Sequence, residues 1–264
     1  MILSITKLYP PNRVILLIGA LLLMIGLALC SQFPGFWFHL AYSIQYATGG
    51  WILSTLFFGL LGFVIIIIAY LLVLGRLSVS SLGITRKTFP FAAIIVAGTW
   101  VAGQILAAIA NLLLGHRLTA ETGGSHSLSA LIAQLFGNSL LEETFFRGYM
   151  IAALMPYFRK STSLVLICSA FAFMLFHIPV HIAQNQPFIL FVAQFGVGVL
   201  LGWLYIKTSN LWLCIGLHSL LDSPALLWAS VIPEWLAPLT GIILCIILGP
   251  RFYDIQKRFL QHVA

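Results

Sequence analysis

The sequence predicts an all-α protein: a polytopic bundle of about eight transmembrane helices with both termini in the cytoplasm. Of its 264 residues, 61% are hydrophobic and only 7% are charged, whereas a soluble domain carries about 25% charged residues. The mean hydropathy is +1.07. Apolar runs of membrane length recur along the chain, and basic residues fall in alternate loops. We therefore expect a single integral membrane domain over residues 1–264, multi-pass and, in a bacterial cell, in the inner (plasma) membrane.

Eight apolar segments are long enough to cross the hydrocarbon core as helices of about 20 residues. They cover residues 13–32, 50–74, 90–114, 128–155, 161–178, 187–206, 210–230 and 235–250. Residues 33–47 are too short and too aromatic to span, so we expect them to lie along the interface. Pro156 is expected to end or kink the fourth helix, because proline has no backbone N–H.

The charges of the loops give the orientation of these segments. One side of the membrane receives most basic residues: Lys7, Arg13, Arg76, Arg86, Lys87, Arg159, Lys160, Lys207, Arg251, Lys257 and Arg258. The other side receives only Arg117, together with Glu121 and Glu234. Lysine and arginine mark cytoplasmic loops, so both termini should be cytoplasmic. This bias also accounts for the net charge of +7, which therefore does not indicate a nucleic-acid partner.

The four cysteines do not indicate a metal site or a disulfide framework. All of them lie within apolar runs, without metal-ligand spacing, at Cys30, Cys168, Cys214 and Cys245. We interpret them as reduced packing residues.

Three ionisable residues stand out in the fourth segment, where residues 138–150 read NSLLEETFFRGYM. Ionisable groups at membrane depth are costly and usually functional. Glu143 and Arg147 are four residues apart, acid first, which favours an ion pair on one helix face. Glu142 lies about 100° further round the helix and points elsewhere. The spacing thus predicts a structural pair and a free carboxylate, although all three could instead form one polar patch between helices.

Three more polar residues lie in later apolar segments. His177 ends the run AFAFMLFHIPV, and His218 and Asp222 share one helix face in CIGLHSLLDSP. A carboxylate and two histidines can activate water: Glu142 accepts a proton, and the histidines relay protons or stabilise an oxyanion. The same three residues could hold a divalent metal such as zinc. For a single histidine, an interhelical hydrogen bond is an equally good explanation.

Other motifs were weighed against these. His181 follows His177 by four residues, but Pro179 interrupts the helix, so we expect His181 at the interface. The chain has no His-Glu-x-x-His sequence, and no Gly-Asp or Gly-x-Ser-x-Gly pattern of an aspartyl or serine intramembrane protease.

Together these residues resemble the three motifs of the CAAX protease and bacteriocin-processing (CPBP, or Abi) family of intramembrane endopeptidases, which includes type II CAAX prenyl proteases. The motifs are Glu142-Glu143-x-x-x-Arg147, Phe173-x-x-x-His177 and His218-x-x-x-Asp222. The resemblance covers about residues 128–230, the expected catalytic core. It implies a helical fold of about eight spans, with the active site inside the bilayer.

The resemblance also implies residue roles. Glu142 and His177 correspond to the residues thought to activate water, and His218 and Asp222 to those thought to stabilise the oxyanion. An ionised aspartate can only accept hydrogen bonds, so for Asp222 we prefer an orienting role, as the acceptor that fixes the ring of His218.

The implied activity is hydrolysis of a peptide bond in a membrane-associated or lipidated peptide by a glutamate- and histidine-activated water, so the expected partners are that peptide and the lipid bilayer. Two other function classes stay open. Buried carboxylates and histidines also suit a proton-coupled transporter, although the paired glycine-interrupted helices typical of transporters are missing. A family member without activity could serve as an immunity or scaffold protein. Nothing in the sequence chooses a prenylated substrate, a metal requirement or an oligomeric state.

Overall fold

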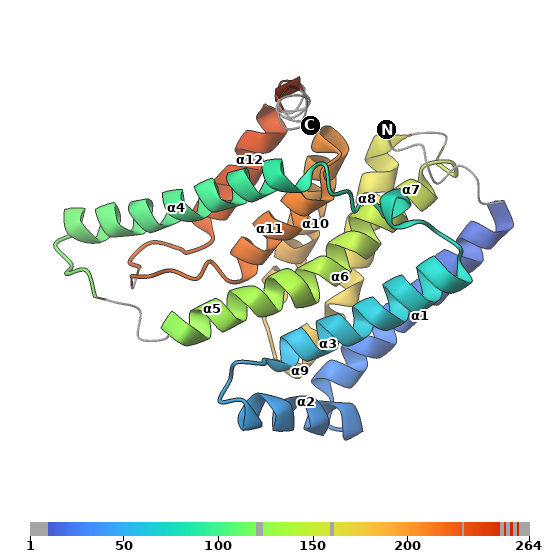
Figure 1. Cartoon of the computed structure of the whole chain (residues 1–264), viewed down its shortest axis with the longest axis horizontal. Helices are drawn as coiled ribbons and strands as arrows, with labels where there is room; N and C mark the ends of the chain where they lie inside the picture. Colours follow the sequence, from blue (N-terminus) through green and yellow to red (C-terminus); the bar gives the residue numbers. More distant parts are fainter. Residues whose placement is uncertain are drawn as a thin grey trace.

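The computed structural model describes residues 10–119, 124–158, 161–228 and 230–248, together with Arg251, Asp254, Ile255 and Arg258. Throughout these residues every regular element is a helix, and there is no β-strand. Figure 1 shows the helices packed as a bundle of rods that cross at different angles. The prediction of an all-α, polytopic helical bundle is confirmed.

All but the last of the N-terminal elements form one side of the bundle (Figure 1). The N-terminal elements are α1 (Pro10–Gln32), α2 (Phe36–Ala47), α3 (Ser54–Gly62), the π-helix η2 (Phe63–Leu74), the short 3-10 helix η3 (Val79–Leu82) and α4 (Phe89–Leu113). α3 continues into η2 without a break, and this rod packs against α1 (Figure 1). α2 is the aromatic segment expected along the interface, and it contacts α1 and α3 at one end of the bundle.

The predicted fourth span is a single rod of mixed helix type. It comprises α5 (Gly124–Ala133), η4 (Gln134–Asn138), α6 (Ser139–Glu143), η5 (Thr144–Met150) and α7 (Ile151–Leu154). The residues at each junction keep right-handed helical angles, so the chain runs on without a loop. The sequence predicted a regular helix here. Instead, wide π-turns, which are frequent at functional sites, lie on either side of the Glu142–Glu143 pair.

The C-terminal elements pack around this rod. They are α8 (Thr162–Phe176), α9 (Ile178–Ala183), α10 (Ile189–Thr208), α11 (Leu211–Asp222) and α12 (Leu236–Ile247). α8 and α10 lie side by side, and α11 contacts α4, α6 and α12.

The predicted span 210–230 is too long, because α11 ends at Asp222. Pro224 disfavours helical angles in the residue before it, and Ser223 is extended with φ −152°. The irregular chain that follows is fastened to α4. The Gln104 Oε1 atom accepts a 2.8 Å hydrogen bond from the backbone of Leu227, and Asn111 Oδ1 accepts one of 3.1 Å from Val231.

Five of the described helices are long and apolar enough to cross a membrane: 14–32, 54–74, 89–113, 162–183 and 189–208. α11 and α12 are apolar but shorter. Twelve residues rise about 18 Å, less than the roughly 30 Å of the hydrocarbon core. The rod that carries Glu142 is not among the five. The total of eight spans therefore stays a prediction.

The motif-bearing rod lies between two hydrophobic clusters. Leu141, Phe145 and Phe146 pack into one, with residues of α1, η2 and α8. Ile151 packs into the other, with residues of α4, α8, α10, α11 and α12. The whole of η5 is buried, including Arg147. Because the rod packs against a cluster on each side, its sequence is apolar on every face apart from the three charged residues.

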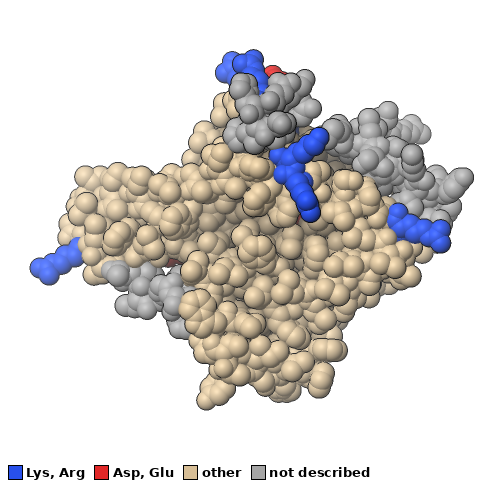
Figure 2. All heavy atoms as spheres, viewed as in Figure 1, with Lys and Arg blue, Asp and Glu red and all other residues tan. Residues whose placement is uncertain are grey.

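Few charged side chains are visible on the face seen in Figure 2: basic side chains lie at its top and at its left and right ends, with one more in the upper middle. Arg76, Arg86, Lys87, Lys207 and Arg251 are all exposed. Other residues used to orient the chain lie outside the described residues, namely Lys7, Glu121, Arg159, Lys160 and Lys257. The cysteines are all free thiols, but Cys30 is exposed on α1 rather than packed.

Candidate active site

The structure brings Glu142, His177 and His218 together from three separate helical segments. Glu142 Oε2 lies 3.9 Å from Nε2 of His177 and 4.0 Å from Nε2 of His218. The side chains of Glu142, His177 and His218 are only 5%, 13% and 3% exposed. These separations exceed a direct hydrogen bond, so one small molecule can lie between the carboxylate and the two rings.

His177 is held by its own helix. Its Nδ1 atom lies 2.8 Å from the carbonyl oxygen of Phe173. A carbonyl only accepts, so Nδ1 carries the proton and Nε2 is the bare nitrogen in the neutral ring. The residue sits at the break between α8 and α9, because Pro179 removes one backbone donor from the helix that would otherwise continue. His177 therefore presents a fixed acceptor toward Glu142.

Glu143 has two partners on the same oxygen. Its Oε1 atom lies 2.8 Å from Nη1 of Arg147 and 2.8 Å from Nδ1 of His218. Sequence spacing suggested only the Arg147 contact, which is the ion pair of one helix turn. The contact with His218 joins residues 75 positions apart, a relation that no local pattern reveals. Glu143 thus orients a ring of the site as well as pairing with Arg147.

Arg147 ties the pair to two further helices. Its Nη2 atom donates a 3.3 Å hydrogen bond to the carbonyl oxygen of Gly198 on α10. Its guanidinium carbon lies 4.5 Å from the centre of the Phe173 ring on α8, a cation–π contact. Gly198 packs closely on the backbone of Ala170: a Cβ atom added to Gly198 would lie 3.0 Å from the Cα atom of Ala170.

Asp222 has the most exposed side chain of these residues. Its Oδ2 atom is 3.4 Å from Nε2 of His218, and its side chain is 38% exposed. The preferred sequence interpretation made Asp222 the acceptor that fixes this ring. In the structure the shorter contact, on the other ring nitrogen, belongs to Glu143. Asp222 instead faces the nitrogen that also faces Glu142.

The proposed metal ligands Glu142, His177 and His218 have suitable chemistry but not a ligand arrangement. Zinc bonds of about 2.0–2.1 Å in a tetrahedron place neighbouring donors about 3.3 Å apart, closer than the 3.9 and 4.0 Å observed. Among the described residues, no group of three His, Cys, Asp or Glu side chains is arranged to hold a metal ion. The reaction steps proposed below use none.

One comparison with known protein families found a match that covers the residues of this site. Residues 124–223 match the family model described as type II CAAX prenyl endopeptidase Rce1-like. Over these residues the chain is similar to that family. The resemblance to CAAX-type intramembrane proteases is therefore confirmed over the part of the chain that contains all seven motif residues. No curated protein and no solved structure matches the chain.

A further histidine, His181, lies near the end of α9, close to the loop that follows, and its expected place at the membrane interface stays a prediction. Within the protein it is 4% exposed and packs on Phe191 of α10, with ring centres 4.4 Å apart. Its ring centre lies 6.4 Å from that of His177. The i, i+4 spacing was the signal for this proximity. It was discounted because of the proline, which begins α9 rather than turning the chain away.

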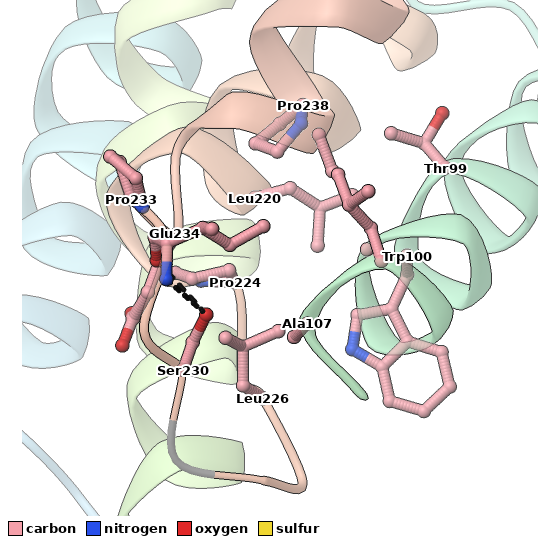
Figure 3. A pocket seen from close by; sticks show the side chains of 14 residues that line it. Thr99, Trp100, Ala107, Leu220, Pro224, Leu226, Ser230, Pro233, Glu234 and Pro238 are labelled. Carbon is pink, nitrogen blue, oxygen red and sulfur yellow. Dashed lines mark hydrogen bonds between the residues drawn. The ribbon is translucent and has the colours of Figure 1, made fainter. Parts of the chain in front are cut away.

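A pocket elsewhere in the structure does not belong to the Rce1-like site. Figure 3 shows it between α4 and the segment that follows α11, lined by Trp100, Leu220 and Glu234 among others. Leu220 is two residues from His218, about 200° round α11. The pocket and the motif residues therefore lie on opposite faces of that helix.

Proposed function

We propose that this protein is an intramembrane endopeptidase that hydrolyses a peptide bond of a membrane-associated or lipidated peptide. The observation that carries the proposal is a single buried carboxylate, Glu142, facing the Nε2 atoms of His177 and His218 at 3.9 and 4.0 Å. A carboxylate and two imidazoles around one small space form a set able to activate water. Residues 128–230 form the catalytic core in this proposal.

Water is activated between Glu142 and His177. The water donates one hydrogen to Glu142 Oε2 and the other to His177 Nε2, which is the bare nitrogen because Nδ1 is held by the Phe173 carbonyl. Glu142 takes the proton as the water oxygen attacks the carbonyl carbon of the peptide. The new C–O bond converts that carbonyl to a tetrahedral oxyanion.

His218 stabilises the oxyanion. When it carries both ring protons, Nδ1 donates to Glu143 and Nε2 donates to the reacting oxygen. Fixing one nitrogen of an imidazole fixes what the other can do. Arg147, on the same Glu143 oxygen, keeps that carboxylate in place.

Collapse of the intermediate completes the reaction. The carbonyl reforms, the C–N bond breaks, and the proton held by Glu142 passes to the departing nitrogen. The products are a free carboxylic acid and a free amine. Water supplies the oxygen and both hydrogens, so no further reactant is needed.

The substrate class follows from the surroundings and from the family. The matched family is described by its activity on CAAX prenyl substrates. Many large hydrophobic side chains of this chain are exposed, and the face seen in Figure 2 carries few charged side chains. A peptide that carries its own lipid partitions into the same layer as this protein. We therefore take a farnesylated CAAX-terminal peptide as the first substrate to test. The enzyme itself is a multi-pass membrane protein in this proposal, located in the inner membrane if the cell is bacterial.

Glu142→Gln is the test of this proposal. The amide has nearly the same shape but cannot take the proton, so cleavage of the farnesylated peptide by protein in nanodiscs should be lost while Tm stays within about 2 °C of wild type. Glu234→Gln makes the same chemical change at an exposed residue away from the site and should cleave normally. Cleavage by Glu142→Gln would contradict the role of Glu142 as the base. A wild type that cleaves no lipidated peptide would contradict the proposed activity and favour a transporter or a scaffold.

A further inference from the structure

His181 has an unsatisfied nitrogen in a buried position. Its Nδ1 atom contacts Oε1 of Gln186, while Nε2 is buried and has no hydrogen-bond partner among the described residues. A buried polar atom without a partner destabilises the fold, because it has lost its hydrogen bond to water and gained none. Such an atom in a folded protein calls for an explanation, and a ligand that binds there is one.

The state of the ring follows from its neighbours. Gln186 Nε2 donates a 2.6 Å hydrogen bond to Oε1 of Gln184, so the Gln186 side-chain oxygen faces His181. An amide oxygen only accepts, so Nδ1 of His181 carries the proton. In the neutral ring Nε2 is then a bare acceptor. It can bind an N–H or O–H group.

The end of α9 holds this arrangement in place. The backbone N–H of Gln186 donates to the His181 carbonyl at 2.9 Å, and that of Asn185 donates to Ile182 at 3.1 Å. Asn185 is left-handed, with φ +49°. These features form a Schellman helix end. These two backbone hydrogen bonds fix the loop, and the loop places the Gln186 side chain against Nδ1 of His181.

His181 lies close to His177, one of the three residues of the proposed reaction centre. It follows His177 by one helix turn, and the ring centres are 6.4 Å apart. Two residues of an extended peptide span about 6.6 Å. His181 is 4% exposed, as is Glu142, and a peptide that contacts His177 needs to extend by only about two residues to contact His181.

A peptide bound here needs acceptors for its backbone. In an apolar environment each unpaired N–H is costly. The walls of the site are helices, whose carbonyl groups are mostly engaged in their own hydrogen bonds. Acceptors must therefore come from side chains or from the ends of helices. His181 Nε2 is a free side-chain acceptor beside the reacting groups.

We infer that His181 is a substrate-binding residue: its Nε2 atom accepts a hydrogen bond from a backbone N–H of the peptide, about two residues from the bond that is cleaved. This inference rests on the proposed function. It adds a fixed point of main-chain recognition on α9, outside the three motifs.

Two substitutions at His181 separate binding from structure. His181→Asn keeps a donor toward Gln186 but removes the acceptor at the Nε2 position. His181→Gln can place an amide oxygen there but loses the Nδ1 donor. With the farnesylated CAAX-terminal peptide, Asn should raise KM about 3–10-fold with kcat little changed, and Gln should have a KM near wild type, since a neutral hydrogen bond of this kind is worth about that factor.

An ester scan of the peptide identifies the donor. Replacing each backbone N–H in turn by an ester oxygen should raise the wild-type KM at one position near the cleaved bond, by a similar factor. The same ester should have no further effect in His181→Asn. Because the scan is run on wild type and His181→Gln as well, it remains decisive if His181→Asn does not fold.

The remaining outcomes all count against the inference. A wild-type KM in His181→Asn, with a lowered Tm in His181→Gln, would show a structural role only, such as a buried water on Nε2. Absence of any ester-sensitive position would overturn it too, while cleavage itself would leave the proposed function standing. A wild type that cleaves no lipidated peptide would overturn the proposed function, and this inference with it.

Discussion

Glu143 and His218 are joined by a contact of 2.8 Å between Oε1 and Nδ1, although 75 residues separate them in the chain. Both side chains are almost completely buried, at 0% and 3% exposed. The second Glu143 oxygen, Oε2, and the Nε atom of Arg147 have no hydrogen-bond partner in the described part of the chain. The carboxylate is therefore shared through one oxygen, and loss of either partner changes the environment of the other.

We predict that Glu143→Gln lowers kcat/KM by about 10–100-fold, the usual effect of removing a residue that orients a functional histidine. The amide can offer Nε2–H instead of an acceptor to His218, so the ring can take the wrong tautomer. Activity against the farnesylated peptide measures this. Glu234→Gln is the matched control, and equal activity of the two variants would show that Glu143 does not orient the ring.

Arg147→Ala should act mainly on stability. It leaves Glu143 buried with one partner fewer, and breaking a buried pair typically destabilises a protein by about 3–5 kcal/mol. It also removes the hydrogen bond to Gly198 and the contact with the Phe173 ring. The yield of folded protein and its Tm in detergent should fall. A well-folded but inactive Arg147→Ala protein would assign Arg147 a direct part in the reaction.

Asp222→Asn tests the most exposed residue of the candidate site. Because Glu143 already holds the other ring nitrogen, and Asp222 is 3.4 Å away and 38% exposed, we expect a smaller loss than for Glu143→Gln. Asp222→Ala should lose more than Asp222→Asn. The measurement is kcat/KM against pH. Activity of Asp222→Asn equal to or above wild type at high pH would favour donation to the oxyanion, since asparagine supplies an N–H that cannot ionise.

The orientation of the chain gives a prediction that is independent of chemistry. Reporter fusions after Arg117 and after Arg258 should report opposite sides of the membrane, with Arg258 cytoplasmic, because basic loops stay inside. Fusions after Arg86 provide a second cytoplasmic point. Identical reports from Arg117 and Arg258 would contradict both the count of eight spans and the predicted side of the termini.

Composition and periodicity were sufficient to predict the helical class, and the apolar runs correspond closely to the helices. The end of α11 was missed, because the run of apolar letters continues past Pro224 while the backbone cannot. The separation of Glu142 from the Glu143–Arg147 turn was visible in the spacing. The sharing of Glu143 with His218 was not, since it depends on how α6 and α11 cross. The burial of His181 likewise depends on packing against α10.

The order of synthesis gives the shared carboxylate a further significance. At roughly 5–20 residues per second, the 75 residues between Glu143 and His218 take about 4–15 s to translate. During this interval Arg147, four residues away, is the partner at hand. The two opposite charges can thus enter the membrane as a neutral unit before α11 exists. His218 is the last partner of Glu143 to be synthesised. A nascent chain that stalls before α11 therefore contains Glu142 and Glu143 but lacks the histidine that contacts Glu143.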